Sequence, residues 1–227
     1  MKLKSLLPLC ALPALLLAAG CATESHKAMQ VDQSKSAATA KKYRGPRKPI
    51  MVGKFDNKSN YMRGIFSDGE DKLGNQAKTV LIAHLQQTGR FSVMDRDNLG
   101  ETAQESKYRG KTQKIKGAEF TVTGVVSEFG RKETGDRQLF GVLGSGKQQT
   151  AYSKVTLSVV DVDSSEVVYS ASGAGEYALS DREVLGFGGN SGYDSTLNGK
   201  VLDLAMREAV DRLVEGLEDG QWTAPTP

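Results

Sequence analysis

Few residues in this chain of 227 residues combine the side-chain types and the spacing that chemistry requires. Residues 141–148 read Gly-Val-Leu-Gly-Ser-Gly-Lys-Gln, with the glycine and lysine spacing of a phosphate-binding loop. That loop needs Ser or Thr after the lysine to hold magnesium, and a helix whose N-terminus faces the phosphate. Here Gln148 follows the lysine and a strand is expected from Tyr152, so we predict no nucleotide site.

Histidines and carboxylates form no catalytic pattern in the sequence either. His26 lies in a polar N-terminal stretch, and His84 lies on the apolar stripe of an expected helix, where we expect a packed or partner-facing role. Asp161, Asp163 and Glu166 fall in or beside turns, where solvation explains them. A carboxylate pair at glycosidase-like separation stays open. We therefore expect no enzyme, no cofactor and no metal site.

Cys21 is the residue with a definite chemical role. Lys2 and Lys4 precede an apolar run at 6–17, which is shorter than the roughly 20 residues of a membrane-spanning helix. Residues 17–21, Leu-Ala-Ala-Gly-Cys, resemble the bacterial lipobox, in which the thiol is acylated and the chain is cut before the cysteine. Residues 1–20 are then a signal peptide and Cys21 is the lipid anchor. An ordinary secretory signal with an incidental cysteine is the alternative.

Lipidation of Cys21 would also decide location and redox state. Cys10 leaves with the signal peptide, so no disulfide is possible. Each buried methylene contributes about 0.8 kcal/mol, so several acyl chains make a lasting anchor. Ala22 follows the cysteine, whereas lipoproteins kept at the inner membrane usually carry Asp there. We expect an outer-membrane lipoprotein whose domain faces the periplasm.

Residues 21–48 are predicted to form a disordered basic tether. Residues 22–48 carry seven Lys or Arg against two Asp or Glu, with no apolar face to bury. A basic cluster that includes Lys41 and Lys42 suggests nucleic acid, but a lipid-anchored periplasmic protein meets none. Contact with anionic lipid or peptidoglycan and a merely solvated linker both stay open. From residue 49 onward, 21 basic residues face 25 acidic ones, so an acidic domain follows a basic tether.

The rest of the chain has regular strand and helix patterns. Ser67 and Glu70 have capping-box spacing before a helix that ends at Gly89. Asn198 is the expected cap of the last helix, which Gly220 ends. The expected strands are 49–56, 91–94, 119–128, 152–162 and 166–175, with a further helix at 96–106.

These elements predict an α+β domain at 49–219, followed by a disordered C-terminal tail at 220–227. The last three strands form an antiparallel set, helices pack on the sheet, and extended Gly-rich β-hairpin loops leave it. Thirteen of the 25 glycines fall between Gly124 and Gly199. Glycine at this density marks long loops or close contacts between backbones.

Several strings, in this order, resemble the CsgG family of outer-membrane lipoproteins. Residues 50–59, Ile-Met-Val-Gly-Lys-Phe-Asp-Asn-Lys-Ser, are similar to the family's first strand and its exit. Residues 76–85 with 90–96 are similar to its first helix and the next strand, and residues 116–126 and 155–167 to later strands. The resemblance implies a CsgG-like periplasmic α/β domain in a ring of identical subunits. Each subunit would add two β-hairpins to one shared outer-membrane barrel.

The resemblance also implies a constriction at the centre of that ring. The run Tyr61-Met-Arg-Gly-Ile65-Phe66 keeps Tyr and Phe at the spacing of the curli channel's constriction loop, with Ile65 where that loop has Asn. Tyr61, Ile65 and Phe66 are therefore the predicted pore-constriction residues. A loop whose aromatic side chains pack on the domain is the alternative.

The two hairpin regions bear on whether the ring is a pore. A membrane-spanning strand needs about 9–11 residues of alternating apolar character. The region 127–149 carries five charges between Arg131 and Arg137, which is tolerable only at an exposed tip, and the region 173–192 is short and broken by glycines. We predict assembly without the need for a full curli-type pore.

The predicted function is therefore support of secretion or assembly of a surface protein or polymer, as a curli-type assembly and transport component. Its partners would be like copies, outer-membrane lipid through Cys21, and a secreted or cell-envelope protein, but no nucleic acid. The alternative is a monomeric periplasmic lipoprotein adaptor that regulates a cell-envelope enzyme.

Overall fold

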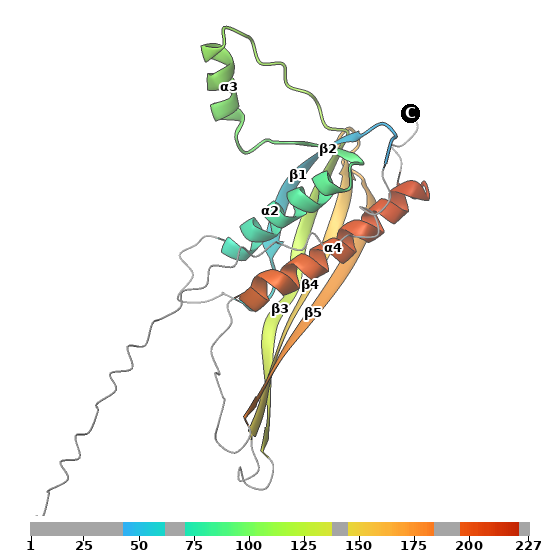
Figure 1. Ribbon diagram of the computed structural model, residues 1–227. Helices are drawn as coiled ribbons and strands as arrows, with labels where there is room; N and C mark the ends of the chain where they lie inside the picture. Colours follow the sequence, from blue (N-terminus) through green and yellow to red (C-terminus); the bar gives the residue numbers. More distant parts are fainter. Residues whose placement is uncertain (1–42, 62–70, 138–144, 184–195, 223–227) are drawn as a thin grey trace, which may run out of the picture. The chain divides into compact units, whose positions relative to one another are not determined.

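The chain folds into one mixed sheet with helices. The computed structural model describes residues 43–61, 71–137, 145–183 and 196–222 (Figure 1). Its elements are β1 (Lys48–Asn57), α2 (Lys72–Gln87), β2 (Phe91–Met94), α3 (Leu99–Tyr108), β3 (Phe120–Arg137), β4 (Ser145–Asp161), β5 (Val167–Glu183) and α4 (Thr196–Glu218). The strand order is β2-β1-β3-β4-β5. β1 runs parallel to β2 and β3, and β3, β4 and β5 are antiparallel, which confirms the α+β fold and the antiparallel set.

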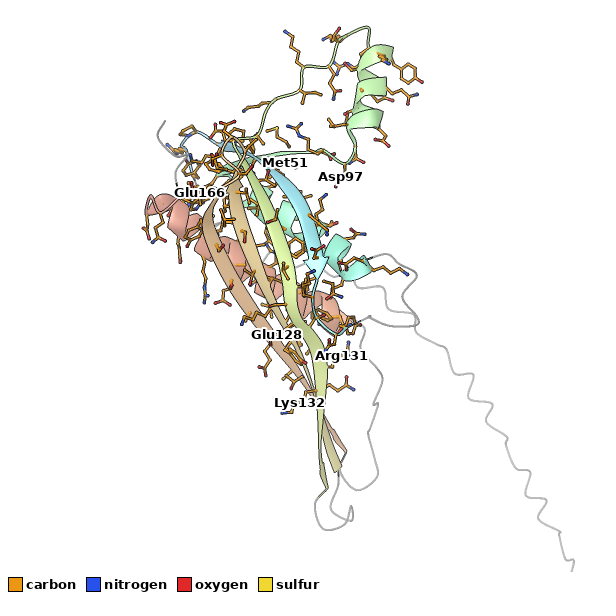
Figure 2. The ribbon with its side chains drawn as sticks, turned by 180° about the vertical axis from the view of Figure 1, so that it is seen from behind. Met51, Asp97, Glu128, Arg131, Lys132 and Glu166 are labelled. Carbon is orange, nitrogen blue, oxygen red and sulfur yellow. The ribbon has the colours of Figure 1, made fainter. Side chains whose placement is uncertain are left out.

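Two helices cover one face of this sheet. α2 packs mainly against β1 and α4 against β5 and β4, and the two helices contact each other. Figure 1 shows them in front of the sheet, and Figure 2 shows the uncovered face. Alternate strand residues and one stripe of each helix make the core, as the sequence pattern predicts. The core includes Ile50, Val52, Leu81, Leu85, Phe91, Phe120, Val122, Leu157, Val159, Leu202, Met206 and Leu213.

β3, β4 and β5 continue beyond the predicted strands 119–128, 152–162 and 166–175, into the two predicted hairpin regions. β3 and β4 stay paired to Arg137 opposite Ser145, and β4 and β5 stay paired to Ser145 opposite Glu183. The charged residues between Arg131 and Arg137, which a membrane hairpin would tolerate only at an exposed tip, belong to the paired strand β3. The charged residues and glycines give this part of β3 no apolar pattern, but its backbone is paired with β4 as far as Arg137.

Glycines on β5 allow α4 to approach the sheet at backbone distance. A Cβ atom built on Gly173 would lie 2.2 Å from the Ala205 carbonyl oxygen and 2.4 Å from the Ala209 nitrogen. One built on Gly175 would lie 2.7 Å from the Val201 carbonyl oxygen. These are contacts with backbone that cannot move aside, so close helix–strand packing explains part of the glycine density.

The end of α4 is closed by glycine and by the only tryptophan of the chain. Gly220 has a φ of 70° and donates its N–H to the Leu217 carbonyl, while the Gln221 N–H reaches the Gly216 carbonyl. This pair of hydrogen bonds is a Schellman motif. It turns the chain back, so that Trp222 is buried and donates from Nε1 to the Leu213 carbonyl at 3.0 Å. Packing thus extends beyond Asp219, where the domain was expected to end.

The two predicted N-caps are wrong. α2 begins after Asp71, whose carboxylate accepts the Gly74 N–H at 2.8 Å and the Asn57 N–H at 2.6 Å, so the cap also joins the helix to the end of β1. Ser67 and Glu70 lie outside the described residues. α4 begins at Thr196, and Asn198 lies inside its first turn, where its side chain bonds Tyr61 and Arg131. Within the described ranges, no helix is both long and apolar enough to cross a membrane.

We predict that Gly173→Ala lowers the free energy of unfolding by about 1–3 kcal/mol, because an added methyl group overpacks the contact with α4. Urea unfolding followed by Trp222 fluorescence measures the change. Gly199→Ala is the matched control: it lies in α4 with no atom within 4 Å of its new Cβ. That variant should be neutral or stabilised by up to about 1 kcal/mol. Equal behaviour of the two variants would contradict the packing argument.

Candidate functional site

The turn that follows β1 holds the first predicted constriction residue. Asn57 Oδ1 accepts the Ser59 N–H at 3.0 Å and the Ser59 hydroxyl at 2.6 Å, and Asn57 Nδ2 donates to the Tyr61 carbonyl at 2.9 Å. The Ser59 hydroxyl in turn accepts the Tyr61 N–H at 3.3 Å. An asparagine that bonds its own backbone two residues on is a typical turn former. The local sequence therefore fixes the backbone up to Tyr61.

The Tyr61 side chain packs onto the domain between β3 and the start of α4. Its ring centroid lies 4.7 Å from that of Phe129, which is buried. Its hydroxyl accepts from Asn198 Nδ2 at 2.6 Å, and Asn198 Oδ1 accepts from Arg131 Nε at 2.9 Å. Figure 2 labels Arg131 on this part of β3. We call Tyr61, Phe129, Asn198 and Arg131 the junction cluster, since it joins the β1 turn, α4 and β3.

The structure brings the predicted site residues together only in part. Tyr61 is placed in the junction cluster, in the packed arrangement that the sequence left as an alternative. Ile65, Phe66 and Cys21 lie outside the described residues. The constriction role of the three loop residues and the anchoring role of Cys21 stay predictions.

A second polar contact joins the two helices. His84 is buried, and its Nε2 lies 2.8 Å from Asp203 Oδ1, which confirms the packed role expected for this histidine. Arg207, one turn further along α4, donates to Asp203 Oδ2 at 3.1 Å. The hydrogen bond with His84, aided by the charges of His84 and Arg207, holds the pKa of the Asp203 carboxyl below its ordinary value. The contact between His84 and Asp203 therefore links α2 to α4.

A third polar contact fixes the point where the tether enters the domain. The Arg90 side chain is 2% exposed and bonds Glu218 near the end of α4, with Nε at 2.8 Å from the carboxylate. Arg90 also donates to the Thr88 carbonyl at 3.0 Å. The Tyr43 ring lies over the guanidinium, 5.2 Å from its carbon. The last residues of the tether therefore rest on the fold.

One carboxylate was misjudged from the sequence. Asp161 is buried, not solvated, and accepts the Ser164 N–H at 2.7 Å and the Ser164 hydroxyl at 2.8 Å. These two bonds hold the pKa of the Asp161 carboxyl below its usual value. Its role is to close the β4–β5 turn, because an Asp side chain can replace a backbone acceptor there. Among the described residues no group of His, Cys, Asp and Glu could hold a metal ion.

Sequence reasoning also missed several partners in these contacts. Asn198 and Arg131 are 67 residues apart along the chain and only the fold brings them together. The burial of Trp222 could have been predicted from the sequence, since a single large aromatic residue in an otherwise polar tail is a candidate for burial.

Comparison with known proteins identifies the family. The family model for the curli production assembly/transport component CsgG matches residues 27–225. The chain belongs to the CsgG family. A curated relative from Neisseria meningitidis serogroup B, named as a candidate lipoprotein, is 60% identical over 203 residues, which cover 89% of this chain and 90% of the relative.

Two solved structures are similar to this CsgG-family chain at low scores. The PelC dodecamer from Paraburkholderia phytofirmans is 15% identical, with coverage of 74% of this chain and 93% of that chain and a TM-score of 0.36. The lipoprotein GNA1162 from Neisseria meningitidis is 17% identical, with coverage of 76% and 99% and a TM-score of 0.32. At these scores the likeness carries no statement about function.

We predict that Asp203→Asn flattens the acid side of the stability profile. Because the folded pKa of Asp203 is lowered, its contribution is complete above the unfolded pKa and is lost as pH falls through the folded value. Asp203 is partly exposed, so screening limits the effect to about 1 kcal/mol. Urea midpoints between about pH 6 and pH 3 measure it. Asp163→Asn is the control and should keep the wild-type slope; an unchanged slope in Asp203→Asn would contradict the link.

Proposed function

We propose that this CsgG-family protein is an outer-membrane lipoprotein that assembles into a homo-oligomer through its α+β domain. In this proposal the assembly supports secretion or surface assembly of a protein or polymer, as a curli-type assembly and transport component. The observation that carries it is the family match over residues 27–225, which includes every described strand and helix. The proposal assigns the protein no catalytic step and no cofactor.

The charged ends of β3 and β5 favour an aqueous environment over a membrane for this part of the sheet. Residues 131–137 of β3 include five charged side chains, and residues 181–183 of β5 are all charged. Ionised side chains inside a membrane cost roughly 2.5–3.5 kcal/mol each at the centre, and more in some estimates. Our proposal therefore includes assembly of the domains but does not depend on a pore.

One observation favours a second candidate, the monomeric periplasmic adaptor that regulates a cell-envelope enzyme. Tyr61 is satisfied within its own chain by Phe129 and Asn198, so this residue needs no neighbouring subunit to hold it. An adaptor would keep the same fold and lipid anchor but would contact its enzyme as a single subunit.

We predict that Cys21→Ser leaves the domain folded but moves the protein from the membrane fraction to the soluble fraction. Serine offers no thiol for acylation, so the acyl chains that hold the protein are lost. Ultracentrifugation of cell lysates with immunoblotting measures the distribution, and Cys10→Ser is the control, which should stay with the membrane. Full retention of the Cys21→Ser variant would show that Cys21 is not the anchor.

The oligomer is tested on the lipidated, full-length protein purified in detergent. Light scattering should give a protein mass that is a fixed multiple of one subunit, and conductance in planar bilayers then tells a pore from a closed assembly. A subunit mass at all concentrations would contradict the proposal and favour the adaptor. An assembly with no conductance would keep the proposal and exclude a channel.

A further inference from the structure

The segment between β2 and β3, residues 95–119, leaves the sheet and returns to it as a separate arm (Figure 1). At its start, Asp97 pairs with Lys78 of α2 at 2.6 Å, and Figure 2 labels Asp97 there. At its end, the Glu119 N–H donates to the Pro49 carbonyl at 2.8 Å. The arm contains α3 and the segment that follows it, and its two ends are fixed to the fold.

The arm holds its own shape without a core. Arg96 donates to the Lys116 carbonyl at 2.7 Å, Gln113 to the Thr102 hydroxyl at 2.9 Å, and the Ser106 hydroxyl to the Lys111 carbonyl at 2.9 Å. These bonds close the returning segment on α3. The arm is therefore preformed, which lowers the entropy cost of docking.

The helix in the arm lacks the packing that a short helix needs. α3 has ten residues and none of them is buried, whereas isolated helices shorter than about 12–15 residues are marginal in water. Tyr108 and Ile115 expose 72% and 61% of their surface. A helix this short, with the exposed Tyr108 at its end and the exposed Ile115 in the segment that follows, fits a surface supplied by another molecule.

The distribution of charge indicates which molecule supplies the surface that covers the arm. Residues 107–116 carry five Lys or Arg and no acidic residue, while the rest of the chain from residue 49 carries 16 basic and 25 acidic residues. Asp211 and Glu215 of α4 and Asp219, the residue just after it, recur every four residues and so follow one side of the helix and its end. Glu215 and Asp219 are exposed. A second copy of this chain thus offers an acidic surface that is complementary in charge to the basic arm.

The topology places the two surfaces on different parts of the sheet. The arm follows β2, which is one edge strand, and α4 packs on β5, the other edge strand, and on its neighbour β4. Copies set side by side would bring the arm of one next to α4 of the next. A contact of this head-to-tail kind is heterologous and closes into a ring when the rotation allows.

We propose that the arm, residues 95–119, docks on the acidic side of α4 in the neighbouring copy and forms the subunit contact of the oligomer. Lys111 and Lys114 face Asp211, Glu215 and Asp219, and Tyr108 and Ile115 are covered in the contact. This inference rests on the proposed oligomer and names the surfaces that build it.

The first test reverses charge in the lipidated, full-length protein and follows assembly by light scattering over a dilution series. Lys111→Glu with Lys114→Glu should raise the concentration for half assembly about tenfold or more, because like charges then meet across the contact. Lys41→Glu with Lys42→Glu changes the tether by the same charge and should stay within about twofold. Trp222 fluorescence checks that every variant is folded. Assembly of the arm variant at wild-type concentration would overturn the inference.

The second test exchanges the charges. Glu215→Lys with Asp219→Lys should weaken assembly as much as the arm variant does, and the four substitutions in one chain should restore it to within about threefold of wild type. Two weakened variants whose combination is weaker still would overturn the pairing of these surfaces.

A third measurement separates failure of this inference from failure of the proposed function. A carbodiimide joins lysine amines to carboxylates that touch, so a mixture of isotope-labelled and unlabelled copies should yield mixed peptides from the arm and α4. An oligomer without these peptides overturns the arm contact and keeps the oligomer. A monomeric mass with these peptides overturns the stable oligomer and keeps the contact; a monomeric mass without them overturns both. Loss of binding to vesicles of anionic phosphatidylglycerol in the arm variant, with normal assembly, would assign the arm to lipid and overturn the inference.

Discussion

The rest of the fold depends on one close contact, that of α4 with β5. Gly173 and Gly175 let the backbone of α4 lie where any side chain on the strand would collide with it. With the helix held this close, several polar contacts can form, among them Asn198 with Arg131, Asp203 with His84, and Glu218 with Arg90. Trp222 then closes the far end against Phe91 and Phe120. A methyl group at Gly173 would therefore collide with the helix backbone at Ala205 and Ala209.

Periodicity predicted the elements whose residues face the core. The stripes of α2 and α4, the alternation in β3 and β4, and the start of β1 are confirmed because burial alone selects apolar residues at those spacings. The predicted strand lengths were wrong where backbone pairing, rather than burial of side chains, sets the end of the strand. β3 was expected to stop at Glu128, yet backbone hydrogen bonds to β4 continue to Arg137 through charged residues and glycines that carry no apolar pattern.

Caps and candidate site residues were harder to predict, since their side chains serve distant partners. Asn198 has the side chain of an N-cap, but Tyr61 and Arg131 occupy it, and the helix begins two residues earlier. Asp71 caps α2 because its carboxylate also reaches Asn57, across 14 residues of sequence. Asp161 was taken as a solvated residue because sequence shows that it borders a turn, but not that the turn bonds its carboxylate and buries it. Tyr61 was identified as a site residue by family resemblance, whereas its packing on Phe129 needed the fold.

We propose that this CsgG-family protein works as a closed assembly of identical, lipid-anchored subunits. Native mass spectrometry of the lipidated protein, released from detergent micelles, tests it most directly because it counts subunits and acyl chains together. We expect one dominant species with a fixed number of subunits, each carrying its acyl groups on Cys21. A lipidated single subunit as the dominant species across the working concentration range would contradict it.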